Sequence, residues 1–484
     1  MFELVIFLLT LIIYYYVTLS KKSGPYKSFY EVPGPRNLPV IGTTYLFLGK
    51  NLLKVVLSLL KKYGRCFLVY VPHRMYCTTI PEEIKVILNH PNSLNKSEDY
   101  KHLQEIFKNT LLLAPVEEWR KHRKLINKSF KQGILDMFVD VFYEKSQILS
   151  NILKNGKYDN LTYLFEKFTL DVFCEATIGI ESTILVDEKE HEYVTAVRTT
   201  QHLAFDRVAK LFKTNDFCYS FFPESKVLAK NMEDMKSFIR NVIKYKRSVS
   251  EDDHFLTSDK LPVLDLLLEN SKKERLTDDY IQEEMNLFAG AAADTTAFTI
   301  AYTCLLLAMH PKIQERVYKE IIDAVGKEGI IDQSDLSKFV YTDMAIKESQ
   351  RLLPVVPLIA RIASADIQLG DKLIPANTSM SICFLELHRN PDIYPNPLEY
   401  NPDRFLPEEV AKRPDYTFLP FSGGPRNCIG MKYASMLLKT VIATIVRDFE
   451  LTTKHKSIAE LDFESHVVMT PTHPLDLSFI PRNK

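Results

Sequence analysis

A loop near the C-terminus presents one cysteine among glycines: residues 421–430 read Phe-Ser-Gly-Gly-Pro-Arg-Asn-Cys-Ile-Gly. These residues hold three of the chain's 15 glycines, and a backbone without Cβ atoms can bend tightly and approach a flat group. The thiolate of Cys428 could bind a metal. No second Cys or His stands at the spacing of a tetrahedral zinc site, so one thiolate on an iron porphyrin fits better. An ordinary buried cysteine beside a turn is the alternative for Cys428 taken alone.

The neighbours of Cys428 would support such a group. Arg426 offers a planar guanidinium that can bind a haem propionate. A helix predicted over about residues 431–447 begins just after the cysteine, and its N-terminal dipole and free N–H groups would stabilise the thiolate.

The whole loop resembles the haem-binding signature F-x-x-G-x-R-x-C-x-G of the cytochrome P450 family, and the matching residues are Phe421, Gly424, Arg426, Cys428 and Gly430. The resemblance covers residues 33–484, because other family landmarks follow in the family's order. It implies a mainly α-helical (α+β) fold with small β-sheets. It also implies haem b (iron protoporphyrin) as the cofactor, with Cys428 as the metal ligand and Phe421, Arg426 and Gly430 beside the haem.

Two further segments resemble the family's E-x-x-R and P-x-R-F motifs, Glu348-Ser349-Gln350-Arg351 and Asn401-Pro402-Asp403-Arg404-Phe405. A Glu and an Arg at i and i+3 share one helix face and can pair. The resemblance implies that Glu348, Arg351 and Arg404 form a buried ionic group behind the cysteine loop, where it would fix the loop's position. A solvated surface pair is the alternative for Glu348 and Arg351.

Residues 119–123 resemble the family's W-x-x-x-R motif, which implies that the only Trp of the chain, Trp119, and Arg123 contact the haem. The two side chains lie at i and i+4 on one helix face, so the indole can hydrogen-bond while the guanidinium pairs with a propionate. Arg361 resembles a further propionate-binding arginine. A core aromatic residue is the alternative for Trp119.

Residues 290–296, Gly-Ala-Ala-Ala-Asp-Thr-Thr, resemble the oxygen-side motif [AG]-G-x-[DE]-T-[TS] of the family. The match implies that Asp294 and Thr295 are the catalytic acid–alcohol pair. Bound oxygen must be protonated twice before its O–O bond breaks; a hydroxyl can hold a water or pass a proton, and a carboxylate can resupply it. The family's usual glycine falls on Ala292, which would narrow or shift the oxygen groove.

The segments 119–130, 136–144 and 418–428 most resemble the microsomal family 4 clan, in which fatty acids and other long chains are common substrates. Many members of that clan carry a Glu at the position of Ala291 and form an ester with the haem. Alanine cannot do so, and we therefore expect haem that is non-covalent apart from the Cys428 thiolate.

Composition excludes several classes of protein. The 484 residues include 61 Lys+Arg, 61 Asp+Glu and 46% apolar residues, which argues against disorder and against a general attraction to nucleic acid. Scarce glycine favours helix. Length suggests about three domains, but no linker interrupts residues 40–484, which we interpret as one haem-thiolate catalytic domain.

Secondary-structure patterns predict a helical body with small sheets near both ends. Two strands are expected at Cys66–Val71 and Met75–Ile80, and helices dominate from about 82 to 355. The longest helix is predicted at Thr277–His310, ended by Pro311. Short strands return over residues 450–482.

The N-terminus predicts a membrane anchor. Leu4–Leu19 are uncharged and span about 24 Å as a helix, near the roughly 27 Å of the endoplasmic reticulum membrane. Lys21 and Lys22 follow, so the catalytic domain should be cytosolic. We expect a single-pass signal anchor at 1–20 and a linker with a proline-rich hinge at 21–39. A cleaved signal peptide and a buried helix are the alternatives.

Electrons must come from outside, because the sequence carries no flavin or nicotinamide motif. The resemblance implies NADPH-cytochrome P450 reductase, with cytochrome b5 as a second donor. Exposed lysines near the thiolate side could dock it; the candidates are Lys121, Lys124, Lys128, Lys131, Lys432 and Lys439. Apolar segments predict a pocket for an apolar small molecule: Leu111–Ala114, Phe288, Val355–Ile359 and Val468–Pro471, with the Phe-rich stretch 212–222 near the membrane.

The leading hypothesis is an endoplasmic-reticulum monooxygenase that inserts one oxygen atom of O2 into a fatty-acid-like, hydrocarbon, other lipid or xenobiotic substrate. A haem-thiolate isomerase or lyase that needs no external electrons is the closest alternative. A non-catalytic haem-binding protein would have no use for Asp294 and Thr295.

Overall fold

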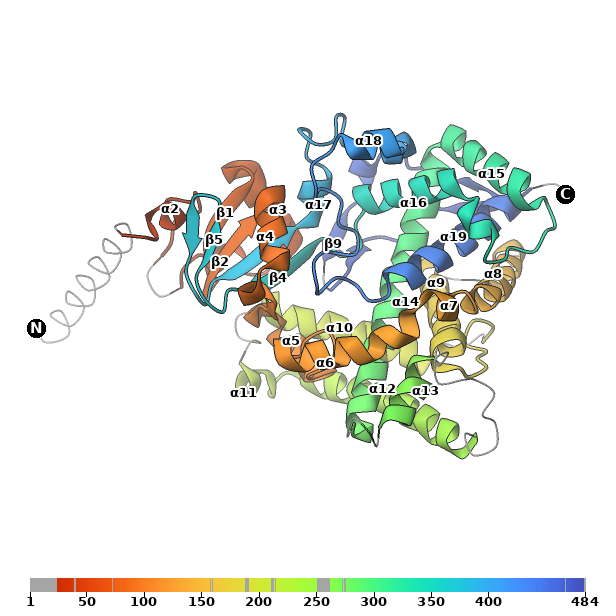
Figure 1. Ribbon diagram of the computed structural model, residues 1–484, viewed down its shortest axis with the longest axis horizontal. Coiled ribbons are helices and arrows are strands. Elements are labelled where there is room, and N and C mark those ends of the chain that lie inside the picture. Colours follow the sequence, from red (N-terminus) through yellow and green to blue (C-terminus); the bar gives the residue numbers. More distant parts are fainter. Residues whose placement is uncertain are drawn as a thin grey trace, which may run out of the picture.

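A five-stranded β-sheet lies at one end of the molecule, and a larger array of helices forms the other end (Figure 1). The structure is a computed structural model that describes residues 24–482, apart from 39–40, 72, 157, 159, 188–190, 210–212, 214, 250–261, 272, 274–275 and 466. The anchor predicted at 1–20 lies outside the described residues.

The described α-helices are, in chain order, α2 (Lys27–Tyr30), α3 (Leu52–Tyr63), α4 (Pro81–Asn89), α5 (Lys101–Phe107), α6 (Val116–Ile126), α7 (Gln132–Leu135), α8 (Phe138–Asn155), α9 (Leu161–Phe173), α10 (Glu192–Ala209), α11 (Asp216–Tyr219), α12 (Pro223–Val249), α13 (Val263–Asn270), α14 (Asp278–Met309), α15 (Pro311–Val325), α16 (Val340–Leu352), α17 (Phe384–His388), α18 (Pro407–Ala411) and α19 (Met431–Asp448). The strands are β1 (Cys66–Val71), β2 (His73–Thr78), β3 (Asn95–Lys96), β4 (Leu358–Ile362), β5 (Ile367–Leu369), β6 (Lys372–Ile374), β7 (Ser379–Cys383), β8 (Phe449–Thr452), β9 (Phe463–Ser465), β10 (Met469–Pro471) and β11 (Ser478–Pro481).

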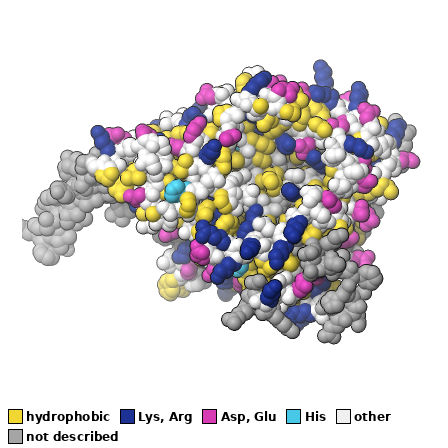
Figure 2. Space-filling view, viewed as in Figure 1, with side chains coloured by type: hydrophobic (Ala, Val, Ile, Leu, Met, Phe, Trp, Pro, Cys, Tyr) yellow, Lys and Arg dark blue, Asp and Glu magenta, His cyan; other side chains and the backbone are white. Residues whose placement is uncertain are grey.

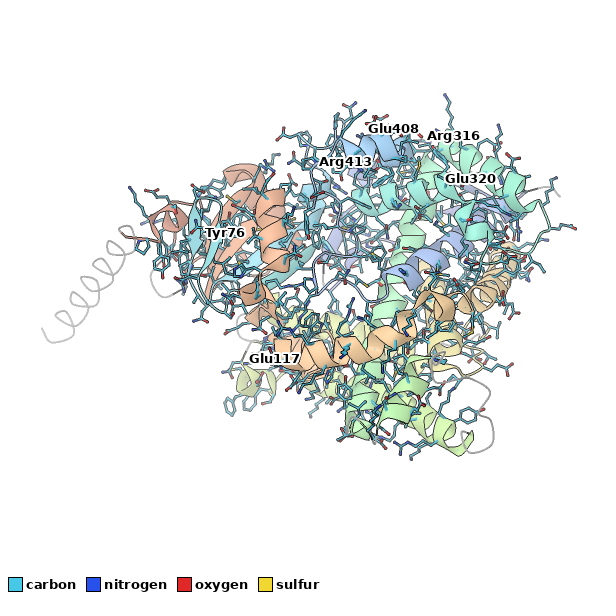
Figure 3. The ribbon with its side chains drawn as sticks, viewed as in Figure 1. Tyr76, Glu117, Arg316, Glu320, Glu408 and Arg413 are labelled. Atoms are coloured by element: carbon cyan, nitrogen blue, oxygen red, sulfur yellow. The ribbon has the colours of Figure 1, made fainter. Side chains whose placement is uncertain are left out.

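The large sheet has the strand order β1-β2-β7-β4-β3, and all neighbours except the parallel pair β2–β7 are antiparallel. The predicted strand at Cys66–Val71 is confirmed, but its partner begins at His73 rather than Met75 because Val71 pairs directly with His73. Tyr76 of β2, labelled in Figure 3, is buried in the sheet and donates a hydrogen bond of 2.6 Å to Glu83 of α4. Sheet and helix are therefore joined at this end.

Helix α14 crosses the helical array and confirms the longest predicted helix (Figure 1). The Thr277 side chain caps it by accepting a hydrogen bond from the Tyr280 N–H at 3.2 Å, and Pro311 begins the next helix. Among the described residues, α14 alone is long and apolar enough to cross a membrane, but 83% of its most apolar window is buried. It is thus the central helix of the core, packed against α9, α12, α16 and α19.

The C-terminal strands tie distant segments to this core. As predicted, short strands follow residue 450: β8 pairs with β11, and β9 with β10. The Met469 N–H of β10 donates to Val355 O at 2.7 Å, and its carbonyl accepts from the Tyr302 hydroxyl of α14. Two segments predicted to line a substrate pocket, around Val355 and Met469, therefore lie side by side.

Candidate active site

The cysteine loop is held by its own backbone hydrogen bonds. Cys428 N–H donates to Phe421 O at 3.0 Å, and Asn427 N–H donates to Gly424 O at 3.2 Å. Gly430 is the N-cap residue of α19, so the predicted helix does begin directly after the cysteine. The Gly430 N–H and the charge of Arg123 lower the pKa of the Cys428 thiol, although burial raises it overall. The Cys428 residue is nevertheless exposed to solvent, and we call the open space beside its side chain the hollow.

Gly424 is required by a contact within the protein. Its φ is +68°, and a Cβ there would lie 2.1 Å from the Leu88 carbonyl oxygen of α4. The sequence suggested that these glycines let the loop approach a flat group. For Gly424 the observed partner is the backbone of α4. The missing Cβ therefore allows the cysteine loop to pack closely against α4.

Three cationic side chains gather beside this loop without an acidic partner. Arg361 of β4 is 1% exposed and donates only to the neighbouring Ala360 carbonyl, while Arg426 is 7% exposed and donates to Ala114 O at 2.6 Å. Lys96 of β3 lies directly across the strand pair from Arg361. Burial, and then the charges of Arg361 and Arg426, lower the pKa of Lys96 well below its ordinary value. Burial, and then the charge of Arg361, lower the pKa of Arg426 to about 9.

This cationic trio of Lys96, Arg361 and Arg426 fits the carboxylates of a haem. Like charges directly opposite on paired strands are destabilising, and an unpaired buried charge is costly. The Nε atoms of Arg361 and Arg426 are buried without a hydrogen-bond partner, and none of the three forms an ion pair within the described residues. An anionic group bound here would satisfy them, and haem propionates are such groups. Lys96 was missed from the sequence because nothing local marks it.

Trp119 and Arg123 of α6 both contact the cysteine loop. The Arg426 guanidinium lies 4.5 Å from the centre of the buried Trp119 ring, a cation–π arrangement. Arg123 donates two hydrogen bonds of 2.8 Å to Asn427, one to its backbone oxygen and one to its side chain. These residues therefore hold the loop from the α6 side, next to the hollow that Cys428 faces.

The structure also brings Glu348, Arg351 and Arg404 together. Arg351 donates to both Glu348 carboxylate oxygens at 2.7 and 2.8 Å, and the Arg404 Nε lies 3.3 Å from the same carboxylate. Glu348 and Arg351 are fully buried. Arg351 also donates to the carbonyls of three distant residues, His388, Pro397 and Glu399. The pair thus pins the chain that leads from α17 to the cysteine loop.

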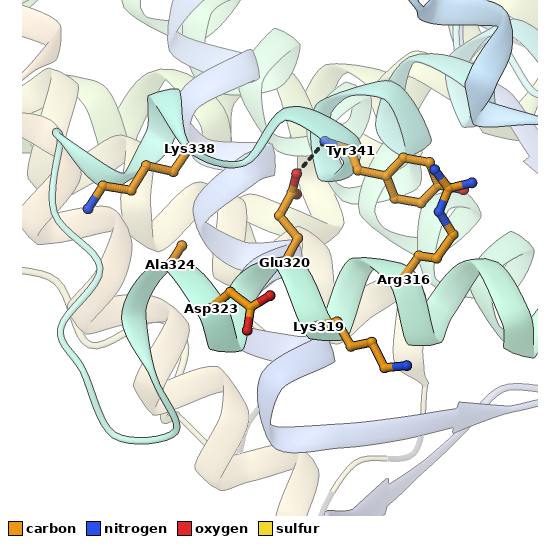
Figure 4. A pocket seen from close by; sticks show the side chains of 7 residues that line it. All are labelled: Arg316, Lys319, Glu320, Asp323, Ala324, Lys338 and Tyr341. Carbon is orange, nitrogen blue, oxygen red and sulfur yellow. Dashed lines mark hydrogen bonds between the residues drawn. The ribbon is translucent and has the colours of Figure 1, made fainter.

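A second acid fixes the start of α16, the helix that carries Glu348. Glu320 of α15 accepts a hydrogen bond from the Tyr341 N–H at 2.6 Å (Figure 4) and one from the Thr342 N–H at 2.8 Å. Arg316 lies over the Tyr341 ring at 3.8 Å. These side chains line a cavity of about 520 Å³ that lies far from the sheet (Figures 3 and 4). Because Glu320 caps the start of α16, we assign this cavity a structural role rather than a catalytic one.

The face of α14 that carries Thr295 is open although the helix is otherwise a core helix. Ala291 is exposed and Thr295 half-buried, and they share a face at i and i+4. The Thr295 hydroxyl donates to the Ala291 carbonyl at 2.6 Å. Gly290 lies elsewhere, since a Cβ there would meet Gln201 and Val197 of α10 at 3.5 Å. Gly290 of this motif therefore faces α10, whereas Ala291 lies on the exposed face of α14.

Asp294 lies about 100° around the helix from Thr295 and is buried against α9 and α10. Burial raises its pKa, while the charge of Arg198 and a hydrogen bond from Gln201 lower it in part. Among the described contacts, none joins Asp294 to Thr295 directly. A cavity of about 620 Å³ reaches Asp294 from the surface. Neither Arg198 nor Gln201 was anticipated, because the sequence does not show which part of α10 meets α14.

Lys and Arg side chains gather over α6 on the face shown in Figure 2. The exposed members of the predicted docking set are Lys121, Lys124, Lys128, Lys131 and Lys432. Lys439 differs, because it is half-buried and its ammonium contacts Asp343 at 3.4 Å and the Leu336 carbonyl. The basic surface is thus smaller than the sequence suggested. Most of it lies on or just after α6, the helix whose Arg123 binds the cysteine loop.

Comparison with known proteins agrees with this geometry. The sequence model of the family described as "Cytochrome P450" matches residues 32–479. "Cytochrome P450 4c21" of Blattella germanica is 32% identical over 99% of this chain and 98% of its own length. "Cytochrome P450 4c3" of Drosophila melanogaster is 31% identical over 99% of this chain and 94% of its own length. "Cytochrome P450 4V2" of Homo sapiens is 30% identical over 93% of this chain and 89% of its own length.

Proposed function

Because this chain belongs to the cytochrome P450 family of haem-thiolate monooxygenases, we propose that it oxygenates a long, apolar, fatty-acid-like molecule with electrons from an NADPH-dependent flavoprotein. The observation that carries this proposal is the uncompensated cationic trio beside Cys428, because it fits an anionic cofactor held next to a thiolate. The family's cofactor, haem b, has this chemistry.

We assign the residues of the site as follows. Cys428 would bind the haem iron, and Lys96, Arg361 and Arg426 would pair with the propionates. Trp119 and Arg123 would hold the loop, while Phe421 and Gly430 would form its two ends. The bound haem supplies oxygen activation and the thiolate donates electron density toward O–O cleavage. Glu348, Arg351 and Arg404 keep the loop in place without touching the cofactor.

Thr295 and Asp294 would deliver protons to the open face of α14. The Thr295 hydroxyl, anchored on the Ala291 carbonyl, can hold a water molecule in the hollow. Asp294 lies on another face, so its proton must reach that water through other ordered water molecules. The raised pKa of Asp294 keeps a proton available near neutral pH.

The substrate class rests on apolar segments that would line the hollow. Leu111, Leu113 and Phe288 belong to one apolar cluster with α5 and α13, and Val355 meets the β10 hairpin. Two phenylalanines at the short helix α11, Phe217 and Phe221, are 74% and 75% exposed with rings 5.2 Å apart. Exposed aromatic pairs of this kind suit contact with lipid, from which an apolar substrate would enter.

We expect that the protein, reconstituted with a P450 reductase, consumes NADPH and hydroxylates a medium- or long-chain fatty acid. Thr295→Ala should keep NADPH consumption but lower the product formed per NADPH by about tenfold or more, because proton delivery then fails. The measurement is product, NADPH and hydrogen peroxide in one assay. Thr303→Ala, one of the buried threonines on the same helix, is the control. Full coupling in Thr295→Ala would contradict the assigned role, and conversion of a peroxide without NADPH would favour the isomerase or lyase.

We also propose that residues 1–20 anchor the chain in the endoplasmic reticulum membrane, with residues 40–484 as one cytosolic catalytic domain. The basic surface over α6 would then face a membrane-bound reductase. In microsomes, carbonate at alkaline pH should leave the intact protein with the membrane. Recovery of full-length protein in the soluble fraction would overturn the anchor.

A further inference from the structure

Glu166 of α9 is a buried acid that the reaction outlined above does not use. Its side chain is 1% exposed, and its Oε2 atom is buried without a hydrogen-bond partner. Its Oε1 atom lies 3.5 Å from the Arg198 guanidinium of α10. A buried carboxylate with one free oxygen is costly in a structural role, so its position needs another explanation.

Glu166 and Asp294 face the same arginine from two helices. Arg198 pairs with Glu166, and its charge also lowers the pKa of Asp294. The charge of Asp294 in turn raises the pKa of Glu166, after burial, which is the larger cause. Helices α9 and α14 are in contact at this point, because the Thr169 hydroxyl, one turn after Glu166, donates to the Ala293 carbonyl at 2.8 Å. Two acids and one cation therefore meet between α9, α10 and α14.

The cavity of about 620 Å³ connects this group to the solvent. Glu166, Arg198, Gln201 and Asp294 all line it, as do residues that lie on the surface, among them Asn160, His202 and His473. The other titratable groups nearby, among the described residues, are Tyr158 before α9, Tyr193 and His202 on α10, Glu464 of β9 and His473 after β10. Water can thus reach Glu166 without crossing the hollow beside Cys428.

We propose that Glu166 is a positioning residue for proton delivery: it shares one proton with Asp294 and resupplies it from the solvent-filled cavity. This inference rests on the proposed monooxygenase function. At rest the shared proton lies on Glu166; the Glu166 carboxylic acid transfers it to the Asp294 carboxylate, which passes it on toward Thr295. The Glu166 carboxylate then takes a proton from hydronium in the cavity, so each cycle moves one proton inward and leaves both acids as they began.

Burial and the neighbouring charge make the two acids titrate as a pair. Both pKa values are raised by burial, and Glu166 is raised further by the ionised Asp294. The pair therefore loses its last proton only above neutral pH, and the apparent values belong to the pair rather than to one residue. Removing Glu166 as a titrating group leaves Asp294 alone beside Arg198, and Asp294 should then lose its proton at lower pH.

The test compares wild type, Glu166→Gln, Glu166→Asp and the control Glu464→Gln, which removes a charge from the same cavity. In the reconstituted full-length enzyme, product formed per NADPH is measured from about pH 6 to about pH 9, the range in which a raised carboxyl titrates. In Glu166→Gln we expect the alkaline fall in coupling to move about one pH unit lower. At alkaline pH its coupling should be about tenfold below wild type, less than the loss of an acid in direct contact. Glu166→Asp should restore part of the profile, and Glu464→Gln should match wild type.

Infrared difference spectroscopy of the haem-loaded protein provides a readout that needs no turnover. Wild type should show a protonated-carboxyl C=O band that titrates in two steps, and Glu166→Gln a single step at lower pH. Identical titrations in both proteins, or a pH profile that Glu166→Gln does not move, would overturn the proposal. A wild-type protein that consumes no NADPH would instead contradict the proposed function. The infrared titration of Glu166 and Asp294 would still test the shared proton.

Stability gives a fold check for the same variant. A carboxyl whose pKa is raised in the folded state binds more protons when folded, so its contribution to stability is lost as pH rises through that pKa. Glu166→Gln should therefore fold normally and lose less thermal stability than wild type on going from about pH 6 to about pH 9. A variant that is less stable at every pH would indicate a structural role.

Discussion

Replacement of Cys428 by His removes the red-shifted thiolate band from the spectrum of the reduced, CO-bound protein. Histidine still offers a nitrogen ligand, so haem can remain bound while the electron-rich sulfur is lost. Turnover should fall by about a thousandfold or more, as is typical when a group that acts on the bond-breaking step is removed. The structure supports a local effect, because the loop's backbone hydrogen bonds from Cys428 to Phe421 and from Asn427 to Gly424 do not involve the sulfur.

The matched control is Cys218→His, because Cys218 is an exposed free cysteine on the short helix α11. It should leave both the CO spectrum and turnover as in wild type. An unchanged thiolate band in Cys428→His would exclude Cys428 as the ligand. Among the described residues the other exposed cysteine is Cys218, which lies on a helix. An unchanged band would therefore leave no cysteine in the described structure as a clear candidate for the haem ligand.

Glu348→Gln is expected to give the largest loss of stability. The carboxylate accepts from Arg351 at two atoms and from the Asn401 N–H at 3.0 Å, in a fully buried position. The amide removes the charge and leaves the Arg351 guanidinium buried and uncompensated, which typically costs about 3–5 kcal/mol. Since a domain is stable by only about 5–15 kcal/mol, we expect most of the protein to be recovered without haem.

Chemical denaturation and the haem-to-protein ratio measure this loss. Glu399→Gln is the comparison, because Glu399 lies 4.0 Å from Arg404 of the same group but its side chain is 57% exposed. A surface charge of that kind contributes at most about 1 kcal/mol. Full haem content and unchanged unfolding in Glu348→Gln would show that the buried group does not hold the loop.

Local signals predicted much of the fold. Thr277 and Pro311 bound α14 because a hydroxyl cap and a missing N–H act within one turn of chain. The cysteine loop and the helix after it were recognisable for the same reason, since every residue of the motif lies within ten positions. The start of β2 was placed two residues late, because Val71 pairs directly with His73, whereas the sequence suggested a turn that included His73.

The remaining parts of the site depend on pairings between distant segments. Lys96 joins Arg361 only because β3 pairs with β4, and Glu166 meets Asp294 only because α9 packs on α14. A lysine in a two-residue strand and a glutamate on an apolar helix look ordinary in one dimension. The face of α14 that carries Gly290 was likewise undetermined, since the sequence does not show which neighbour fills that face.

The cationic trio has a consequence for how the protein reaches its working state. Before cofactor enters, the folded chain confines Lys96, Arg361 and Arg426 in mutual repulsion, while the unfolded chain separates them. A dianionic ligand that binds only the folded form removes this repulsion and shifts the folding equilibrium by mass action. The haem-loaded protein should therefore be more stable than the haem-free protein by an amount that grows with the concentration of free haem.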